Sequence, residues 1–182
     1  FRKPLVAMTP KSLLRHRSAV SSLRDLGPGT TFHRLLDERD CKVKHGAAKR
    51  IVMCSGKIYY DLADARDAAE AWDIEILRVE QLYPFPSKTT FELLAKTPNA
   101  EVIWCQEEPK NMGGWTFVRD FIEDAMEAAS MRQSRLKYAG RHAAASPATG
   151  SFARHVKEQK QLVAEALGPM AAASKKAASA KK

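Results

Sequence analysis

The feature that most limits the fold is a regular alternation of short apolar runs with helix-forming segments, which begins near residue 49. The run Ile51-Val52-Met53-Cys54 is continuous rather than alternating, which is typical of a strand buried on both faces. This order predicts an α/β fold, a three-layer sandwich with a mainly parallel sheet, because right-handed crossovers place helices on both faces of the sheet. The remaining pattern predicts strands at 74–79, 101–105 and 136–139, and helices at 58–72, 88–96 (with Ser87 as N-cap), 115–131 and 152–167 (ended by Gly168-Pro169).

The residues before this alternation give less regular signals. Residues 5–8 form a short apolar run that predicts a strand. Residues 10–26 have helical propensity up to the stop signal Gly27-Pro28-Gly29. Residues 31–36 predict one more short strand, and the polar segment 37–48 predicts a loop.

Charge is unevenly placed along the 182 residues, whose formal net charge is +9. Residues 168–182 are expected to be a disordered tail; they contain lysines but no acidic and no aromatic residue. Without aromatic interleaving, the positive charge does not predict nucleic-acid binding. No apolar run approaches the roughly 20 residues that a membrane-spanning helix needs, so no membrane association is expected. Because the chain opens on Phe1 without a signal-peptide pattern, we expect a piece of a longer polypeptide.

The turn after the first buried strand is a candidate anion site. The order strand, Ser55-Gly56-Lys57, helix would place backbone N–H groups and a lysine at a helix N-terminus. The segment lacks the first glycine and the spacing of a phosphate-binding loop. The alternative, a tight turn at Gly56 with a solvated Lys57, is the stronger interpretation.

Two adjacent carboxylates, Glu107 and Glu108, are expected directly after the strand 101–105. Open α/β sheets place their sites in loops beyond the carboxyl ends of strands, so acid–base chemistry is one interpretation. The structural interpretation is stronger, since neighbouring residues of an extended segment point in opposite directions.

Cysteine and histidine give no catalytic or metal-binding pattern. Cys54 and Cys105 end apolar strands, where a free cysteine behaves as a small hydrophobe, and Cys41 lies in a charged loop. The chain contains no CxxC, and its histidines show no ligand spacing, so a zinc site is not expected. Unpaired cysteines favour a reduced compartment.

Basic residues gather in three places and leave an anion pocket, for a nucleotide or an acyl-CoA, as an open possibility. The three groups are Lys11 with Arg15, Lys49 with Arg50, and Arg141 with His142. The last two groups are expected at opposite ends of strands and therefore need not form one patch. From the residues alone, we expect an α/β domain of binding or assembly type.

Longer stretches carry a resemblance to a known family. They are KPLVAMTPKSLLRH, IVMCSGKIYYDL, ILRVEQLYPFP, VIWCQEEPKNMGGW and YAGRHAAASPATG. In this order, from Arg2 to about Leu167, they closely resemble the C-terminal part of 2-oxoglutarate dehydrogenase, the thiamin-diphosphate-dependent decarboxylating component. The resemblance implies that residues 1–36 end a pyrimidine-binding domain, 37–48 are a linker, and 49–167 form a transketolase-type C-terminal domain.

The resemblance also implies cofactors that this segment does not hold. In the family, thiamin diphosphate and magnesium bind between the two earlier domains. The motif that binds the diphosphate and the metal is absent here, and so are the catalytic histidines. We therefore expect no catalytic, cofactor-binding or metal-binding residue in this segment, and no turnover by the segment alone. The whole enzyme would decarboxylate 2-oxoglutarate and pass the succinyl group to a lipoyl arm, as part of the tricarboxylic acid cycle.

Partners and an effector are implied in the same way. The family is homodimeric, works with a lipoyl-bearing succinyltransferase and a dihydrolipoyl dehydrogenase, and lies in the bacterial cytoplasm or the mitochondrial matrix. Some relatives bind acetyl-CoA or a nucleotide as effector, and the matching polar residues are Arg15, Gln106 and Arg141. Relatives commonly have Gln-Gly-Ala where this chain has Met112-Gly113-Gly114, so no direct role is expected for Met112. The alternative is a self-standing α/β module that binds a nucleotide or a protein.

Overall fold

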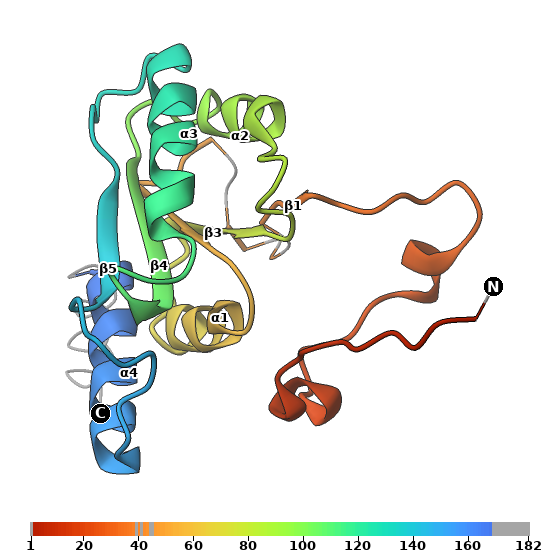
Figure 1. Cartoon of the computed structure of the whole chain (residues 1–182). Coiled ribbons are helices and arrows are strands. Elements are labelled where there is room, and N and C mark those ends of the chain that lie inside the picture. Colours follow the sequence, from red (N-terminus) through yellow and green to blue (C-terminus); the bar gives the residue numbers. More distant parts are fainter. Residues whose placement is uncertain (1, 39, 41, 44–45, 169–182) are drawn as a thin grey trace, which may run out of the picture. The chain divides into compact units, whose positions relative to one another are not determined.

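The computed structural model of the chain describes residues 2–38, 40, 42–43 and 46–168 (Figure 1). The expected disordered tail, apart from Gly168, and Cys41 lie outside the described residues. The contacts divide the chain after Phe32 into an N-terminal unit and a C-terminal unit, which are described separately. No helix among the described residues is both long enough and apolar enough to span a bilayer.

The N-terminal unit contains two short 3-10 helices, η1 (Lys11–Arg15) and η2 (Leu23–Leu26), and neither contains a buried residue. The strand expected at 5–8 and the longer helix expected over 10–26 were wrong. Leu5 and Met8 are more than 90% exposed, so no neighbouring strand or core holds them in place. Isolated helices of this length are marginal without a tertiary surface, and propensity alone does not secure them.

The C-terminal unit is built on a five-stranded sheet with the order β1-β3-β2-β4-β5, within the described residues. β2, β3, β4 and β5 run parallel, and β1 pairs antiparallel with β3 at one edge. The strands are β1 (Leu35–Leu36), β2 (Arg50–Cys54), β3 (Ile74–Val79), β4 (Glu101–Pro109) and β5 (Lys137–Arg141). The helices are α1 (Ile58–Ala68), α2 (Ser87–Leu94), α3 (Trp115–Ala128) and α4 (Phe152–Leu167).

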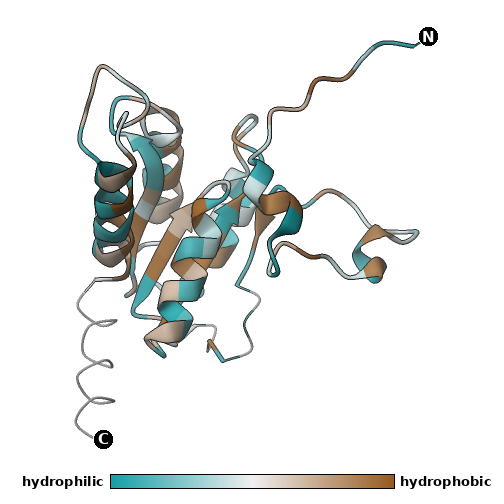
Figure 2. Ribbon diagram, turned by 90° about the horizontal axis from the view of Figure 1, so that it is seen from below, coloured by the Kyte–Doolittle hydropathy of each residue, from teal (hydrophilic) through white to brown (hydrophobic). Residues whose placement is uncertain are grey.

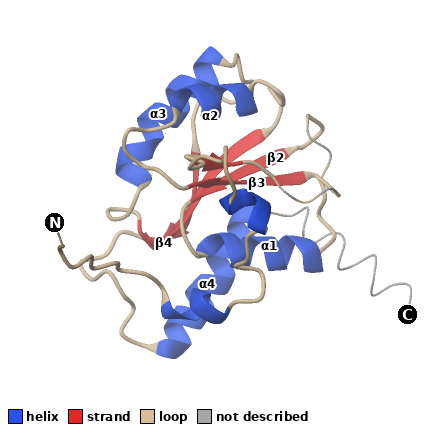
Figure 3. Cartoon of the chain, turned by 90° about the vertical axis from the view of Figure 1, so that its right-hand side faces the viewer, coloured by secondary structure: helices blue, strands red, loops and turns tan. Residues whose placement is uncertain are grey.

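The expected three-layer sandwich with a mainly parallel sheet is confirmed. Helices α2 and α3 cover one face of the sheet, and α1 and α4 cover the other (Figure 3). Successive residues of a strand point to opposite faces, so Met53 and Trp104 enter the core under α3, while Cys54 and Cys105 enter the core under α1 and α4. β2 is accordingly apolar from Ile51 to Cys54, and Figure 2 shows hydrophobic stretches in the strands of the sheet.

Several expected boundaries were wrong in detail. Pro86, not Ser87, is the N-cap of α2, and the Thr90 hydroxyl donates to the Pro86 carbonyl at 3.0 Å. β4 continues to Pro109 past the expected end at Cys105, so Glu107 and Glu108 lie within a strand instead of after it. A register shift between Cys105 and Pro109 accompanies this extension.

The residues around the expected boundary at residue 36 form hydrogen bonds with strand β3 of the sheet. Leu35 and Leu36 pair with Val79 and Arg78. Glu38, buried, accepts a hydrogen bond from the Ile76 backbone N–H at 2.9 Å and forms an ion pair with the buried Arg66. The assignment of 1–36 to a preceding domain and of 37–48 to a linker stays a prediction about a longer protein.

Candidate functional site

The carboxyl ends of β2 and β4 are the place at which a site is expected in an open parallel sheet. The two strands are neighbours in the sheet, paired from Arg50–Glu101 to Cys54–Cys105. The chain leaves β2 toward α1 on one face and leaves β4 toward α3 on the other (Figure 3). Such a switch point opens a crevice that a ligand can occupy in open α/β sheets.

In this chain, side chains bridge the crevice. Lys57, at the start of α1, forms an ion pair with Glu107 of β4. The Gln159 amide on α4 donates to Glu107 Oε1 at 2.9 Å and to Asp61 Oδ2 on α1 at 2.6 Å. The lysine of the candidate anion turn is therefore engaged with a carboxylate, and Ser55 donates to the Val79 carbonyl at 2.8 Å. The tight turn at Gly56 is confirmed by its φ of 76°, whereas the expected solvated Lys57 was wrong, because its ammonium group is paired with Glu107.

The adjacent carboxylates point in opposite directions, as expected for an extended segment. Glu107 faces Lys57 and Gln159 on the α1–α4 side. Glu108 lies beside Gly113, where a Cβ atom would approach its side chain to about 3 Å. The two carboxylates therefore do not form an acid–base pair, and sequence reasoning missed Gln159, the residue that connects Glu107 to α1 and α4.

Gln106 is 3% exposed and its side chain is fully engaged inside the domain. Its Oε1 accepts hydrogen bonds from Trp104 Nε1 and from the Trp115 backbone N–H, both at 2.9 Å. Its Nε2 donates to the carbonyl of Met112 at 2.7 Å and to that of Pro109 at 3.2 Å. Gln106 thus attaches the turn after β4 and the first residue of α3 to the strand.

Arg141, at the end of β5, is engaged on the opposite side. Its Nε donates to the Glu107 carbonyl at 2.6 Å and its Nη2 to the Pro147 carbonyl at 2.5 Å, while Nη1 lies 4.0 Å from Glu158. Gln106 and Arg141 therefore lie on neighbouring strands at the same edge, but their side chains occupy opposite faces of the sheet.

Beside Arg141, the loop between β5 and α4 encloses a cavity of about 350 Å³. Its walls include the basic residues Arg141, His142 and Arg154 and the acidic residues Glu158 and Glu165. Arg154 pairs with Glu158 at 2.6 Å, and this arginine holds the pKa of the half-buried Glu158 carboxyl below its usual value. The cavity is thus lined by charges of both signs.

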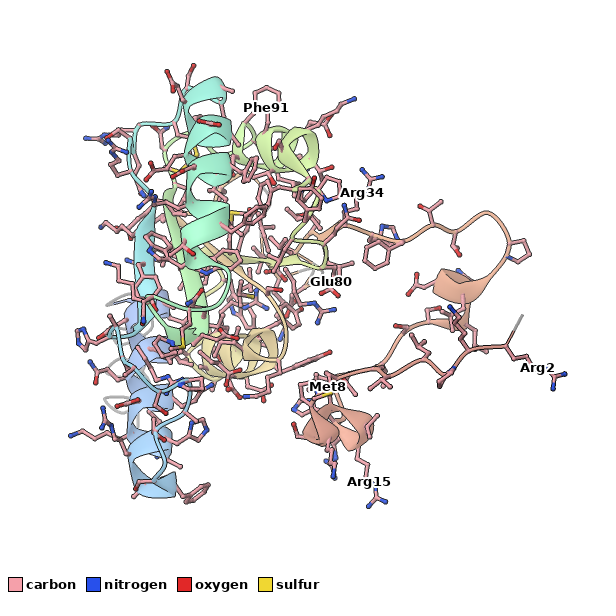
Figure 4. The ribbon with its side chains drawn as sticks, viewed as in Figure 1. Arg2, Met8, Arg15, Arg34, Glu80 and Phe91 are labelled. Atoms are coloured by element: carbon pink, nitrogen blue, oxygen red, sulfur yellow. The ribbon has the colours of Figure 1, made fainter. Side chains whose placement is uncertain are left out.

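The other basic groups lie elsewhere. Arg15 is exposed in the N-terminal unit and points away from its short helix (Figure 4). Lys49 and Arg50 lie at the amino edge of the sheet, which confirms that they are at the opposite end from Arg141 and His142. Arg50 donates to the Ala166 carbonyl at 3.0 Å and pairs with Glu101, so it holds the C-terminus of α4.

The described residues contain no group of three or more histidine, cysteine, aspartate or glutamate side chains that could hold a metal ion. Cys54 and Cys105 are buried free thiols, as expected. Burial raises the pKa of the Cys54 thiol to about 12 and that of Cys105 well above its usual value. Both cysteines therefore stay neutral and pack as apolar side chains.

Comparisons with known proteins place this geometry in a family. The solved structure described as "Split gene transketolase, inactive beta4 tetramer" matches with a TM-score of 0.45 and 14% identity, over 78% of this chain and 44% of that chain. The 2-oxoglutarate dehydrogenase E1 components of Brucella anthropi and Brucella ovis are 47% identical over 176 residues, which is 92% of this chain and 18% of each protein. The corresponding protein of Brucella abortus is 46% identical over the same share. Residues 20–167 match the family described as 2-oxoglutarate dehydrogenase C-terminal, and the chain belongs to this family.

Proposed function

We propose that the chain is the C-terminal part of the decarboxylating component of a 2-oxoglutarate dehydrogenase complex. The whole protein would oxidatively decarboxylate 2-oxoglutarate and transfer the succinyl group to a lipoyl group. The observation that carries this proposal is the 47% identity with E1 components over 176 residues. This chain spans only 18% of the length of those relatives. The short span favours a part of a larger enzyme over the alternative of a self-standing binding module.

The proposed enzyme uses thiamin diphosphate and magnesium, and the switch point of this chain does not fit them. In proteins, Mg²⁺ is usually bound by one or two carboxylates together with phosphate oxygens and water. At the switch point, the Glu107 carboxylate and the Lys57 ammonium group are paired with each other, and the described residues contain no group of three or more His, Cys, Asp or Glu side chains that could hold a metal ion. The proposed contribution of this domain is structural, in domain contacts and in the walls around the site, and no reaction step is assigned to its residues.

The same proposal implies partners and a location. The protein would act as a homodimer, together with a lipoyl-bearing succinyltransferase and a dihydrolipoyl dehydrogenase, in the bacterial cytoplasm, as its similarity to Brucella proteins favours. No role for nucleic acid or membrane is proposed.

For control by acetyl-CoA or a nucleotide, we propose Arg15, Gln106 and Arg141 as the residues involved, with different roles. Arg15 is exposed and presents a guanidinium suited to a phosphate. Gln106 and Arg141 have their polar atoms engaged by the turn after β4 and by the loop after β5. These two would shape the effector site through the loops that they hold.

The function is tested by comparing the longer polypeptide with the 182-residue chain. We expect decarboxylation of 2-oxoglutarate, dependent on thiamin diphosphate and magnesium, in the longer polypeptide only. Activity of the 182-residue chain alone would overturn the proposal that this domain is structural and that catalysis needs the rest of the protein. A longer polypeptide that is folded and loaded with cofactor but does not consume 2-oxoglutarate would overturn the proposed substrate.

Effector control is tested separately in the active enzyme. Arg15→Ala should weaken the response to acetyl-CoA or a nucleotide and leave the basal rate and thermal stability unchanged. Arg141→Ala should change the effector response together with the stability, because the loop after β5 loses its attachment. Unchanged activation curves for Arg15→Ala would remove this residue from the effector site.

A further inference from the structure

One surface of the C-terminal unit combines apolar side chains that remain in contact with solvent. We call Leu82, Tyr83, Phe117 and Phe121 the aromatic patch. Tyr83 is 80% exposed, and the other three are between 36% and 39% exposed. On the neighbouring helix α2, Phe91 is 38% exposed and projects outward (Figure 4).

The aromatic patch is held in place by ring contacts within the domain. The rings of Tyr83 and Phe117 lie 6.3 Å apart, those of Phe117 and Phe121 lie 5.1 Å apart, and Phe121 stacks on Phe85 at 5.4 Å. The loop that carries Tyr83 is fixed by the Gln81 amide, which donates to the Pro84 carbonyl at 2.8 Å. Such a preformed apolar surface loses little conformational entropy when a partner covers it.

The charges near the patch indicate an apolar partner. Helices α2 and α3 each carry an ion pair of opposite charges, Lys88 with Glu92 at 3.9 Å on α2 and Arg119 with Asp120 at 2.9 Å on α3. A surface without a predominant charge does not attract nucleic acid or an anionic bilayer. A contiguous apolar patch of this kind marks a surface for protein contact.

Two observations favour a partner within the same polypeptide. The E1 components that match this chain have most of their length outside the matched segment, so a large protein surface belongs to the same molecule. The opposite helical layer has only Phe152 as a large exposed hydrophobic residue, so the apolar exposure of the domain is concentrated on the α2–α3 side. We propose that the aromatic patch is the surface through which this domain packs against another domain of its own longer polypeptide. This inference rests on the proposed function.

Hydroxyl-radical footprinting of the longer polypeptide tests this inference. The matched control is Phe152, which is 82% exposed and lies on the opposite layer. After correction for intrinsic reactivity, we expect oxidation of Tyr83 to be about tenfold slower than that of Phe152, since interface cores pack as densely as interiors. The protection should be the same at all protein concentrations and without other components. Equal oxidation of the two residues would overturn the inference.

The other possible occupants give different results. Protection of Tyr83 that appears only as protein concentration rises would assign the patch to a second copy and overturn the inference. Protection that appears only on adding the lipoyl-bearing component would assign it to that partner and also overturn it. A protected Tyr83 in a protein that does not use 2-oxoglutarate would support the inference and count against the proposed function alone.

Variants give an independent readout. Tyr83→Ser replaces a side chain that is 80% exposed, so it leaves the core of the domain intact. In the longer polypeptide it should increase the rate of proteolysis between the domains about tenfold, because an interface aromatic is often a hot spot. Phe152→Ser is the control and should not change that rate. Equal rates for the two variants would contradict the proposed contact.

Discussion

Helices α2 and α3 expose several aromatic side chains on their outer surface, whereas α1 and α4, apart from Phe152 at the start of α4, expose charged and amide side chains linked across the layer. On the first side lie Tyr83, Phe117 and Phe121. On the second side, Gln159 joins α4 to Asp61 of α1 and to Glu107 of the sheet. Both layers cover the same parallel sheet with an apolar inner surface.

The difference shows that the inner surface of a helical layer is determined by the sheet that it buries, whereas its outer surface is determined by what it contacts outside the domain. The inner surfaces are alike because both bury the sheet, and burial of apolar area stabilises both about equally per unit area. The outer surface of α1 and α4 has the polar side chains that suit contact with water. The outer surface of α2 and α3 has apolar area that suits contact with protein.

The largest effect is expected from the buried charges beneath the α1 side. In Glu38→Ala, Arg66 would lose its principal partner in a position where its side chain is 3% exposed. Loss of one partner of a buried pair costs about 3–5 kcal/mol, and because Arg66 keeps Asp67 at 3.0 Å and Asp40 at 3.7 Å, the free energy of unfolding should fall by an amount at the lower end of this range. Urea-induced unfolding of the chain measures this change.

The matched control lies on the other layer. Glu92→Ala removes the carboxylate of the exposed pair Lys88–Glu92, whose atoms lie 3.9 Å apart. The free energy of unfolding should fall by no more than about 0.5 kcal/mol. Equal losses in the two variants would show that the Glu38–Arg66 ion pair does not stabilise the contact of Glu38 with the sheet.

The next effect compares two glutamines, Gln106 of β4, which faces the α3 side of the sheet, and Gln159 of α4. Gln106→Ala would leave the buried Trp104 Nε1 and the Trp115 N–H at the start of α3 without their acceptor. The free energy of unfolding should fall by about 2–4 kcal/mol, since each unsatisfied buried group costs about 1–3 kcal/mol. Gln159→Ala removes hydrogen bonds near the surface and should cost about 1 kcal/mol or less. Thermal or urea unfolding of both variants measures whether the loss of the buried Gln106 amide lowers the free energy of unfolding more than the loss of the Gln159 amide.

A third comparison uses two glycines at the ends of the α4 region. Gly150 and Gly168 both have φ of +68°, but a Cβ at Gly150 would meet nothing within 4 Å, whereas at Gly168 it would clash with the Arg50 guanidinium. Gly150→Ala should cost about 1 kcal/mol from backbone strain alone. Gly168→Ala should cost about 2 kcal/mol, because Arg50 also loses its contacts with the end of α4. Equal costs would show that Arg50 does not stabilise α4.

The smallest effect concerns the thiols packed under α1 and α4. Because burial raises the pKa of Cys54 to about 12, this thiol should resist iodoacetamide in the folded chain at neutral pH and react after unfolding. A buried neutral thiol stabilises the fold below its ordinary pKa of 9.0, and this contribution is lost as the pH rises from there toward 12. Mass spectrometry of the alkylated chain measures the reaction. Rapid modification of Cys54 at neutral pH would indicate that the α1–α4 layer opens readily.

The elements from residue 50 onward could be predicted because their signals are local. The continuous run at 51–54 and the segments around 74–79 and 152–167 carry their own apolar patterns, and the structure places elements there. Residues 5–26 also have local propensity, but none of their large apolar side chains is buried. Propensity without burial does not hold a strand or a long helix, which explains why those predictions were wrong.

The candidate site could be located only in part. The structure brings Lys57, Glu107 and Arg141 together at one edge of the sheet, and the sequence did not predict this grouping. The assignment of Arg15, Gln106 and Arg141 to an effector stays a prediction. Two chain-distant contacts were invisible, Lys57 with Glu107 and Gln159 with Glu107, because 50 and 52 residues separate the partners.

By itself, the sequence determined which segments are strands and helices in the C-terminal unit, that the sheet is mainly parallel, and to which family the chain is similar. These properties follow from local periodicity and from long stretches of matching residues. Only the tertiary structure decided that Gln106 and Arg141 face opposite sides of the sheet and that the switch point is bridged. The physical reason is that facing depends on the register between β4 and β5, which shifts after Cys105, and that ion pairs depend on distances between segments far apart in the chain.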